Sequence, residues 1–141
     1  MTAVDHVEAF DTTLEKTYAW LRDLAEELGT GNRHQAYDVL RGFLHALRDR
    51  LPVESAVNLG AQLPMLVRGF YYEGWDPTHK PEKMHREEFL ERVGREAHLE
   101  PDQVESAVRA ASTTLQRHVT EGELAKSLGI LPNDIFRLLV S

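Results

Sequence analysis

The chain has 141 residues, 42% hydrophobic and 28% charged, a composition typical of one globular domain rather than of a disordered segment. It contains no cysteine, which excludes disulfides, thiolate metal sites and cysteine nucleophiles. No apolar run approaches the roughly 18 residues of a membrane span, and no secretory signal pattern opens the sequence, so we expect a cytoplasmic protein without a membrane partner. The net charge of −7 repels phosphate backbones and disfavours nucleic acid as a partner.

The first part of the chain predicts two long helices. The first begins near Asp5, where Asp5 and Glu8 have the spacing of a capping box, and ends before Gly29. One buried stripe is expected along it, made of Phe10, Leu14, Thr17, Leu21, Leu24 and Leu28. The second helix begins after Asn32 and ends before Pro52. Its apolar stripe is Ala36, Leu40, Phe43, Leu47 and Leu51.

A corner follows these helices. Residues 53–72 have a helical period that Pro64 interrupts, which predicts two short helices meeting at residues 61–63 or one strongly kinked helix. Residues 73–81 contain glycine and prolines and predict a connecting loop. Because this loop is short, we expect the two halves of the chain to pack together in a single domain of residues 1–141.

The second half repeats the plan of the first. A shift of 68 positions places Leu47 on Leu115 and Leu51 on Val119, and it superposes the Leu-Pro pairs at 63–64 and 131–132. A shift one residue longer pairs Trp20 with Phe89. Repetition on this scale is typical of stacked helical units that share a core.

The repeat predicts the remaining elements. We expect helices over residues 82–98, from Pro101, over residues 121–128 with Thr120 and Glu123 as a capping box, and from Pro132 to Val140. No run alternates between apolar and polar residues, so no sheet is expected. The sequence therefore predicts an all-α bundle of seven or eight helices, built from pseudo-repeats at about residues 5–72 and 82–141.

Aromatic residues gather where the first repeat ends. Aromatic side chains beside arginine are typical of the residues that dominate binding energy at protein interfaces. The predicted contact surface for a protein partner, or for a second copy in a homodimer, consists of Arg68, Tyr71, Tyr72, Trp75 and Asp76, with Arg48 and Arg50 nearby. The competing interpretation is that Trp75 folds back and fills the gap between the halves.

Residues 121–139 also match a helix-turn-helix pattern, in which Ala125 is small, Gly129 makes the turn and Ile135 is buried. A DNA-binding protein would then present Asn133, Asp134 and Arg137 to the major groove. A repeated structural corner explains the pattern in both halves and fits the acidic charge better. DNA binding through residues 121–139 is therefore the alternative function.

The sequence contains no recognisable catalytic constellation, because its serines lie in no nucleophile elbow and it has no glycine-rich phosphate loop. His79, His85 and Glu88 lack the paired spacing of metal ligands. We therefore predict a non-enzymatic helical binding or scaffold module without cofactor or metal. An enzyme, or a small-anion binder with an unrecognised site, is the third hypothesis.

Several segments together resemble a known family, most specifically between about Ala36 and Leu90. They include residues 19–21, 36–37, 47–51, Gly60-Ala61-Gln62-Leu63-Pro64, the run from Arg68 to Pro77, and Phe89-Leu90. In these segments the chain is similar to the uncharacterised bacterial proteins grouped as domain of unknown function 2267. The resemblance implies a small soluble helical protein, and it supplies no activity, substrate, cofactor or functional residue.

Overall fold

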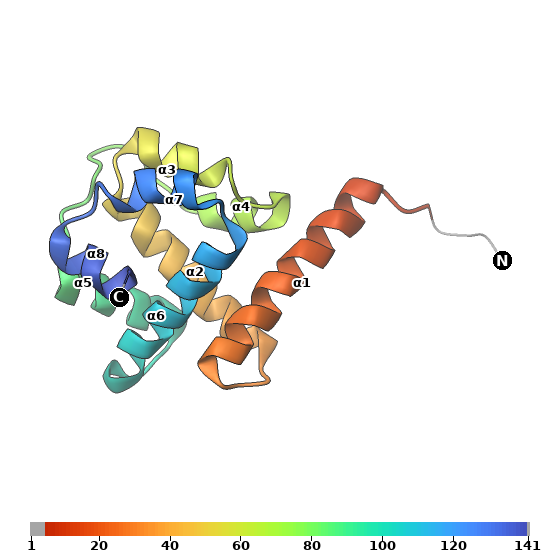
Figure 1. Cartoon of the computed structure of the whole chain (residues 1–141), viewed down its shortest axis with the longest axis horizontal. Coiled ribbons are helices and arrows are strands. Elements are labelled where there is room, and N and C mark those ends of the chain that lie inside the picture. Colours follow the sequence, from red (N-terminus) through yellow and green to blue (C-terminus); the bar gives the residue numbers. More distant parts are fainter. Residues whose placement is uncertain (1–4, 141) are drawn as a thin grey trace.

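The computed structural model describes residues 5–140, and these contain eight helices and no strand, which confirms the all-α fold class. Residue 141, the end of the second predicted repeat, lies outside them. The helices are α1 (Glu8–Leu28), α2 (Arg33–Arg50), α3 (Val53–Gly60), α4 (Met65–Tyr72), α5 (Arg86–Ala97), α6 (Pro101–His118), α7 (Glu121–Leu128) and α8 (Asn133–Leu139). Figure 1 shows α2 and α6 at the centre, α3 beside α7, and α1 projecting from the body.

The helix bounds repeat along the chain. Helices α2, α3 and α4 begin at residues 33, 53 and 65, and α6, α7 and α8 begin 68 positions later, at residues 101, 121 and 133. Equivalent positions are buried in both copies, among them Leu47 with Leu115 and Val67 with Ile135. Both copies contribute to one apolar core, where Phe43 of α2 meets α5. The structure thus has two copies of one helical plan around a shared core.

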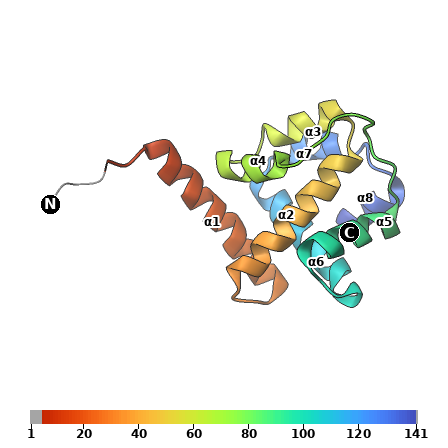
Figure 2. The same cartoon turned by 180° about the vertical axis from the view of Figure 1, so that it is seen from behind.

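The first helix of the second copy is shorter than its counterpart. Both α1 and α5 end in a residue with left-handed backbone, Gly29 and His98, which lie 69 positions apart. With these ends aligned, the first residue of α5, Arg86, corresponds to Thr17. Residues 8–16 of α1 therefore have no equivalent in the second copy. They form the part of α1 that projects beyond the other helices (Figures 1 and 2).

Local signals fix several helix ends as expected. The Asn32 side chain accepts hydrogen bonds from the backbone N–H groups of His34 and Gln35, at 3.0 and 3.2 Å. Pro52 and Pro64 each stand directly before a helix, where the missing N–H removes no helical hydrogen bond. Residues 53–72 are therefore two short helices rather than one kinked helix.

Two of the expected capping boxes are wrong. Helix α1 begins at Glu8 after Val7, so Asp5 stands too far from the helix start to cap it. Thr120 does precede α7, but its side chain makes no capping hydrogen bond. A serine, threonine or aspartate at the right spacing is thus not sufficient, because its side-chain oxygen must also reach the N–H groups of the first turn.

The connection between the repeats is longer than predicted, since α5 begins at Arg86 instead of residue 82. The backbone before α5 is bound to the end of α2. The N–H of Glu82 donates to the carbonyl of Asp49 at 2.8 Å, and the carbonyl of Met84 accepts from Arg50 Nε at 2.9 Å. These bonds hold residues 82–84 in an extended path, so the connection spans residues 73–85.

The buried stripe predicted along α1 is only half correct. Thr17, Leu21 and Leu24 are buried, whereas Phe10 and Leu14 are 58% and 43% exposed. The physical reason is that the projecting half of α1 meets the body at Thr13, which is buried and accepts a hydrogen bond from the backbone N–H of Leu66 at 2.9 Å, and this contact leaves Phe10 and Leu14 uncovered. An amphipathic helix thus continues past the core that buries its other half, and its apolar face stays open.

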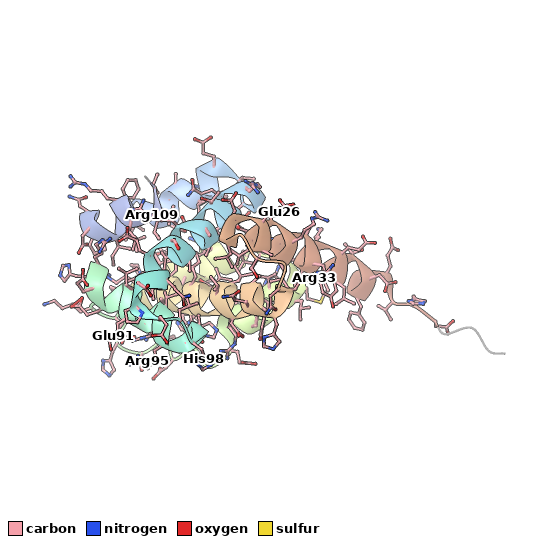
Figure 3. The ribbon with its side chains drawn as sticks, turned by 90° about the horizontal axis from the view of Figure 1, so that it is seen from below. Glu26, Arg33, Glu91, Arg95, His98 and Arg109 are labelled. Atoms are coloured by element: carbon pink, nitrogen blue, oxygen red, sulfur yellow. The ribbon has the colours of Figure 1, made fainter. Side chains whose placement is uncertain are left out.

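The outer surface of the bundle carries the charged side chains expected of a globular domain. On α5, Glu91 and Arg95 face outward and form a helical ion pair of 3.7 Å, as Figure 3 shows from below. Within residues 5–140, no helix combines the length and hydropathy that crossing a bilayer requires.

Candidate functional site

The aromatic cluster predicted as a contact surface is largely engaged inside the chain. Tyr71 is fully buried, and its hydroxyl donates to the carbonyl of Ala56 at 2.7 Å. Burial raises the pKa of the Tyr71 phenol. Trp75 is half-buried, packs on Tyr72 with 5.4 Å between ring centroids, and places its indole N–H away from solvent. Asp76 remains exposed.

Two arginines of the predicted contact surface, Arg48 and Arg50, bind the backbone of the segment that connects the repeats. Arg48 is buried and donates to the carbonyls of Tyr71 and Glu73 at 2.8 and 3.0 Å. Arg50 donates to the carbonyl of Met84. These contacts fix the segment that joins the repeats, which is a structural use of the two side chains.

An ionic cluster at the end of α2 was not foreseen from the sequence. The carboxylate of Asp49 is nearly buried and lies within ion-pair distance of Arg48 at 2.9 Å, Arg92 at 3.0 Å and Lys80 at 3.8 Å. Arg92 also contacts Glu82. The cluster ties α2 to α5 and to the connection between the repeats.

The predicted helix-turn-helix is the second copy of the α3–α4 corner. Helix α7 lies beside α3 (Figure 1), and Ile135 and Leu138 of α8 are buried. Asp134, a predicted base-reading residue, accepts a hydrogen bond from the backbone N–H of Arg86 at 2.9 Å. That bond from Arg86 lowers the pKa of the Asp134 carboxyl. Asp134 thus connects α8 to the start of α5.

An open apolar surface lies where the projecting half of α1 meets α4. We define the α1–α4 face as Phe10, Leu14 and Tyr18 of α1 with Leu66 of α4. Their exposed fractions are 58%, 43%, 51% and 42%. A groove of about 410 Å³ runs beside them, and it is lined by Leu14, Thr17, Tyr18, Leu21, Tyr37, Leu66, Gly69, Phe70 and Glu73. A groove with these apolar walls can take side chains from a helix.

The charges around the α1–α4 face are mainly acidic. Asp11 and Glu15 are exposed on the same half of α1, and Glu73 closes one end of the groove. Two cations are close, since Arg33 lies 5.3 Å from the centre of the Tyr18 ring and Arg41 forms an ion pair with Glu73 at 2.6 Å. The face therefore combines apolar side chains with a negative surround.

A protein-family model described as an uncharacterized conserved protein (DUF2267) matches residues 17–138 of the chain. This range contains both helical repeats. The chain belongs to the DUF2267 family. No curated protein matches its sequence. Membership in DUF2267 assigns no activity, and the match begins at Thr17, the residue that aligns with the start of α5. The projecting half of α1 therefore lies before both the DUF2267 match and the internal repeat.

The histidines of this DUF2267 chain form no metal centre in residues 5–140, where no three acidic or histidine side chains are grouped to hold an ion. His85 and Glu88, weighed as metal ligands from sequence, stand at the start of α5 instead. Glu88 accepts a hydrogen bond from the backbone N–H of His85 at 3.2 Å. The pair thus caps a helix.

A buried histidine joins the two repeats. Nε2 of His45 lies 2.6 Å from the carbonyl oxygen of Phe70, and Nδ1 contacts the carboxylate of Glu96. Both ring nitrogens of His45 thus face an oxygen atom. Arg41 donates to the same carboxylate at 2.8 Å. Burial raises the pKa of Glu96, but the hydrogen bond and charge of His45, with Arg41, outweigh it, so that pKa lies below its ordinary value of 4.5.

Replacing Glu96 by glutamine is expected to lower the free energy of unfolding by about 1–3 kcal/mol at neutral pH, because the bonds to His45 and Arg41 lose their charge assistance. Since folding lowers the pKa of Glu96, its contribution is present above 4.5 and is lost as the pH falls through the lowered value. Urea unfolding measured at several pH values tests this. The prediction is contradicted if the free energy of unfolding falls equally steeply with acidification in the wild-type chain and in the E96Q variant.

Proposed function

We propose that this DUF2267 protein is a non-enzymatic protein-binding module of the bacterial cytoplasm, and that it binds a partner helix on the α1–α4 face. The observation that carries the proposal is the exposure of Phe10, Leu14, Tyr18 and Leu66 around a groove of about 410 Å³. Exposed apolar side chains concentrated at one place are typical of contact sites. The absence of cysteine fits a reducing compartment.

The position of the face supports a binding use over a packing use. Residues 8–16 of α1 have no counterpart in α5, and no apolar side chain among them belongs to the shared core, although Thr13 is buried against α4. Phe10 and Leu14 are nevertheless apolar and continue the buried stripe of Leu21 and Leu24 at helical spacing. An extension of this kind presents an apolar face to a second molecule.

The charges favour an amphipathic helix with basic flanks as the partner. Its apolar side chains would enter the groove, and its lysines or arginines would meet Asp11 and Glu15. A second copy of this chain carries the same acidic residues on its own α1 and would repel them. We therefore favour a basic helix over a second copy of the chain as the partner.

A fluorescent model helix of leucine and lysine is expected to bind the chain, and a Leu14→Lys substitution is expected to raise its Kd by about tenfold, as for loss of a central interface contact. Ile130→Lys is the matched control, since Ile130 is 52% exposed and distant in sequence, and it adds the same charge. Fluorescence anisotropy measures both, with thermal unfolding to confirm the fold of each variant.

Other results would separate the alternatives. Equal weakening by Leu14→Lys and Ile130→Lys would show a general charge effect and remove the α1–α4 face from the proposal. If a helix of leucine and glutamate binds as tightly as the helix of leucine and lysine, the partner need not be basic, and that part of the proposal is contradicted. If sedimentation shows a dimer that only Leu14→Lys dissociates, the partner is a second copy of the chain.

A further inference from the structure

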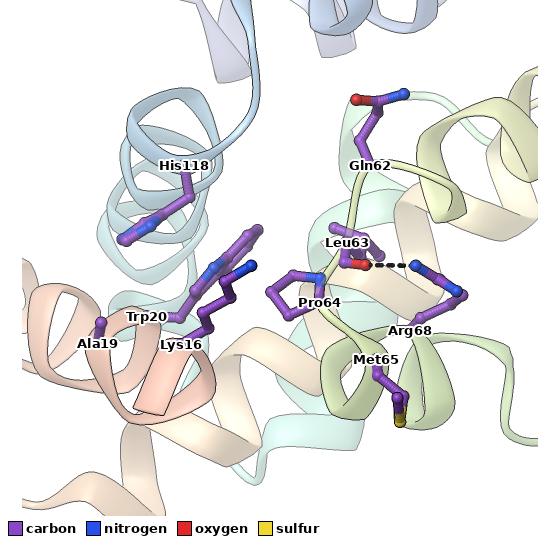
Figure 4. A pocket seen from close by; sticks show the side chains of 9 residues that line it. All are labelled: Lys16, Ala19, Trp20, Gln62, Leu63, Pro64, Met65, Arg68 and His118. Atoms are coloured by element: carbon purple, nitrogen blue, oxygen red, sulfur yellow. Dashed lines mark hydrogen bonds between the residues drawn. The ribbon is translucent and has the colours of Figure 1, made fainter. Parts of the chain in front are cut away.

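A separate cleft lies on the other flank of α1. It has a volume of about 440 Å³ and lies where α1, the turn between α3 and α4, and the end of α6 meet (Figure 4). Its lining consists of Lys16, Ala19, Trp20, Gln62, Leu63, Pro64, Met65, Arg68 and His118. The volume falls in the range of small-molecule sites. The lining comes from three separate segments of the chain, so only the folded protein assembles it.

One wall of the cleft is a fixed pair of rings. The indole of Trp20 and the imidazole of His118 stack with 4.8 Å between centroids and 20° between planes. Nε2 of His118 lies 2.7 Å from the carboxylate of Asp23, which holds the imidazole in place. The opposite wall is apolar, formed by Leu63, Pro64 and a half-exposed Met65. These two walls suit the flat apolar body of a ligand.

The cleft is positive although the chain is acidic. Lys16 is exposed at its edge and forms no ion pair or hydrogen bond within residues 5–140. Arg68 is held at the other side, where it donates to the carbonyls of Gly60 and Leu63 at 3.0 and 2.9 Å. Neutral carbonyls leave the guanidinium charge uncompensated. Of the nine described residues that line the cleft, none is acidic.

We propose that this cleft binds an organic anion, a carboxylate carried on a flat apolar ring system. The carboxylate lies between Lys16 and Arg68, and the rings lie between Met65 and the imidazole of His118, which stacks on the buried indole of Trp20. Charge-assisted hydrogen bonds from the two cations fix the anionic end, and the apolar walls exclude water from the rest. The proposal assigns binding alone to the cleft and no reaction.

The two tryptophans of the chain allow a direct test. Proton–nitrogen NMR gives one indole N–H signal for Trp20 and one for Trp75, and a Trp75→Phe variant assigns them. Titration with 2-naphthoate is expected to shift the Trp20 signal saturably and to leave the Trp75 signal in place. The uncharged 2-naphthamide, which has the same rings, is expected to bind at least about tenfold more weakly, because it loses the charge-assisted bonds.

Lys16→Gln is expected to raise the Kd for 2-naphthoate by about tenfold. The matched control is Lys83→Gln, which changes the net charge equally at another exposed lysine and is expected to leave the Kd unchanged. Three results would each overturn the proposal. They are no shift of Trp20 with either ligand, equal affinity for the acid and the amide, and equal effects of the two lysine substitutions.

Discussion

Replacing Asp49 by alanine is expected to lower the free energy of unfolding by about 3–5 kcal/mol, since it leaves buried cations without their counter-ion. The Asp49 carboxylate lies 2.9 Å from Arg48, which is itself buried, and 3.0 Å from Arg92. Water cannot fully hydrate these guanidinium groups once the carboxylate is gone. Urea unfolding at neutral pH, followed by circular dichroism, measures the loss.

Two further variants test the cause of that loss. Asp38→Ala removes a carboxylate that pairs with an exposed histidine at 3.5 Å, and it is expected to cost less than about 1 kcal/mol. Arg92 keeps its contact with Glu82, so the stranded cation is the buried Arg48. Adding Arg48→Met to Asp49→Ala removes that charge and is expected to recover part of the stability. If Asp49→Ala costs no more than Asp38→Ala, the ionic cluster does not stabilise the fold as described.

The helical plan was predictable because its signals are local. The apolar spacing around Leu47, the cap at Asn32 and the proline before each short helix all act within a few residues. Because the repeat presents the same helical plan twice, a segment whose secondary structure is ambiguous in one copy can be compared with its equivalent in the other. Residues 53–72, for example, match residues 121–139, where Gly129 and Pro132 also separate two helices.

The candidate sites were less predictable because they depend on where neighbouring helices end. Phe10 and Leu14 stand at helical spacing, as Leu21 and Leu24 do, and nothing within α1 distinguishes the exposed pair from the buried pair. The difference in length between α1 and α5 is the signal that could have identified Phe10 and Leu14 as exposed. The cleft had no such signal, since Lys16 and His118 stand more than a hundred positions apart and meet only through tertiary packing.

Leu47→Ala and Leu115→Ala are expected to destabilise the chain by similar amounts, each about 2–5 kcal/mol. Both leucines are fully buried, and they occupy the same position of α2 and α6 in the two copies of the repeat. Leu14→Ala is the control and is expected to cost less than about 1 kcal/mol, because that side chain is 43% exposed and leaves no closed cavity.

Urea unfolding of the three leucine variants separates a shared core from two independent ones. In a shared core, Leu47→Ala and Leu115→Ala each lower the midpoint of a single transition, because neither repeat buries its apolar face alone. Each repeat would otherwise unfold in its own transition, and each substitution would shift only one of them. That second pattern would contradict the common core.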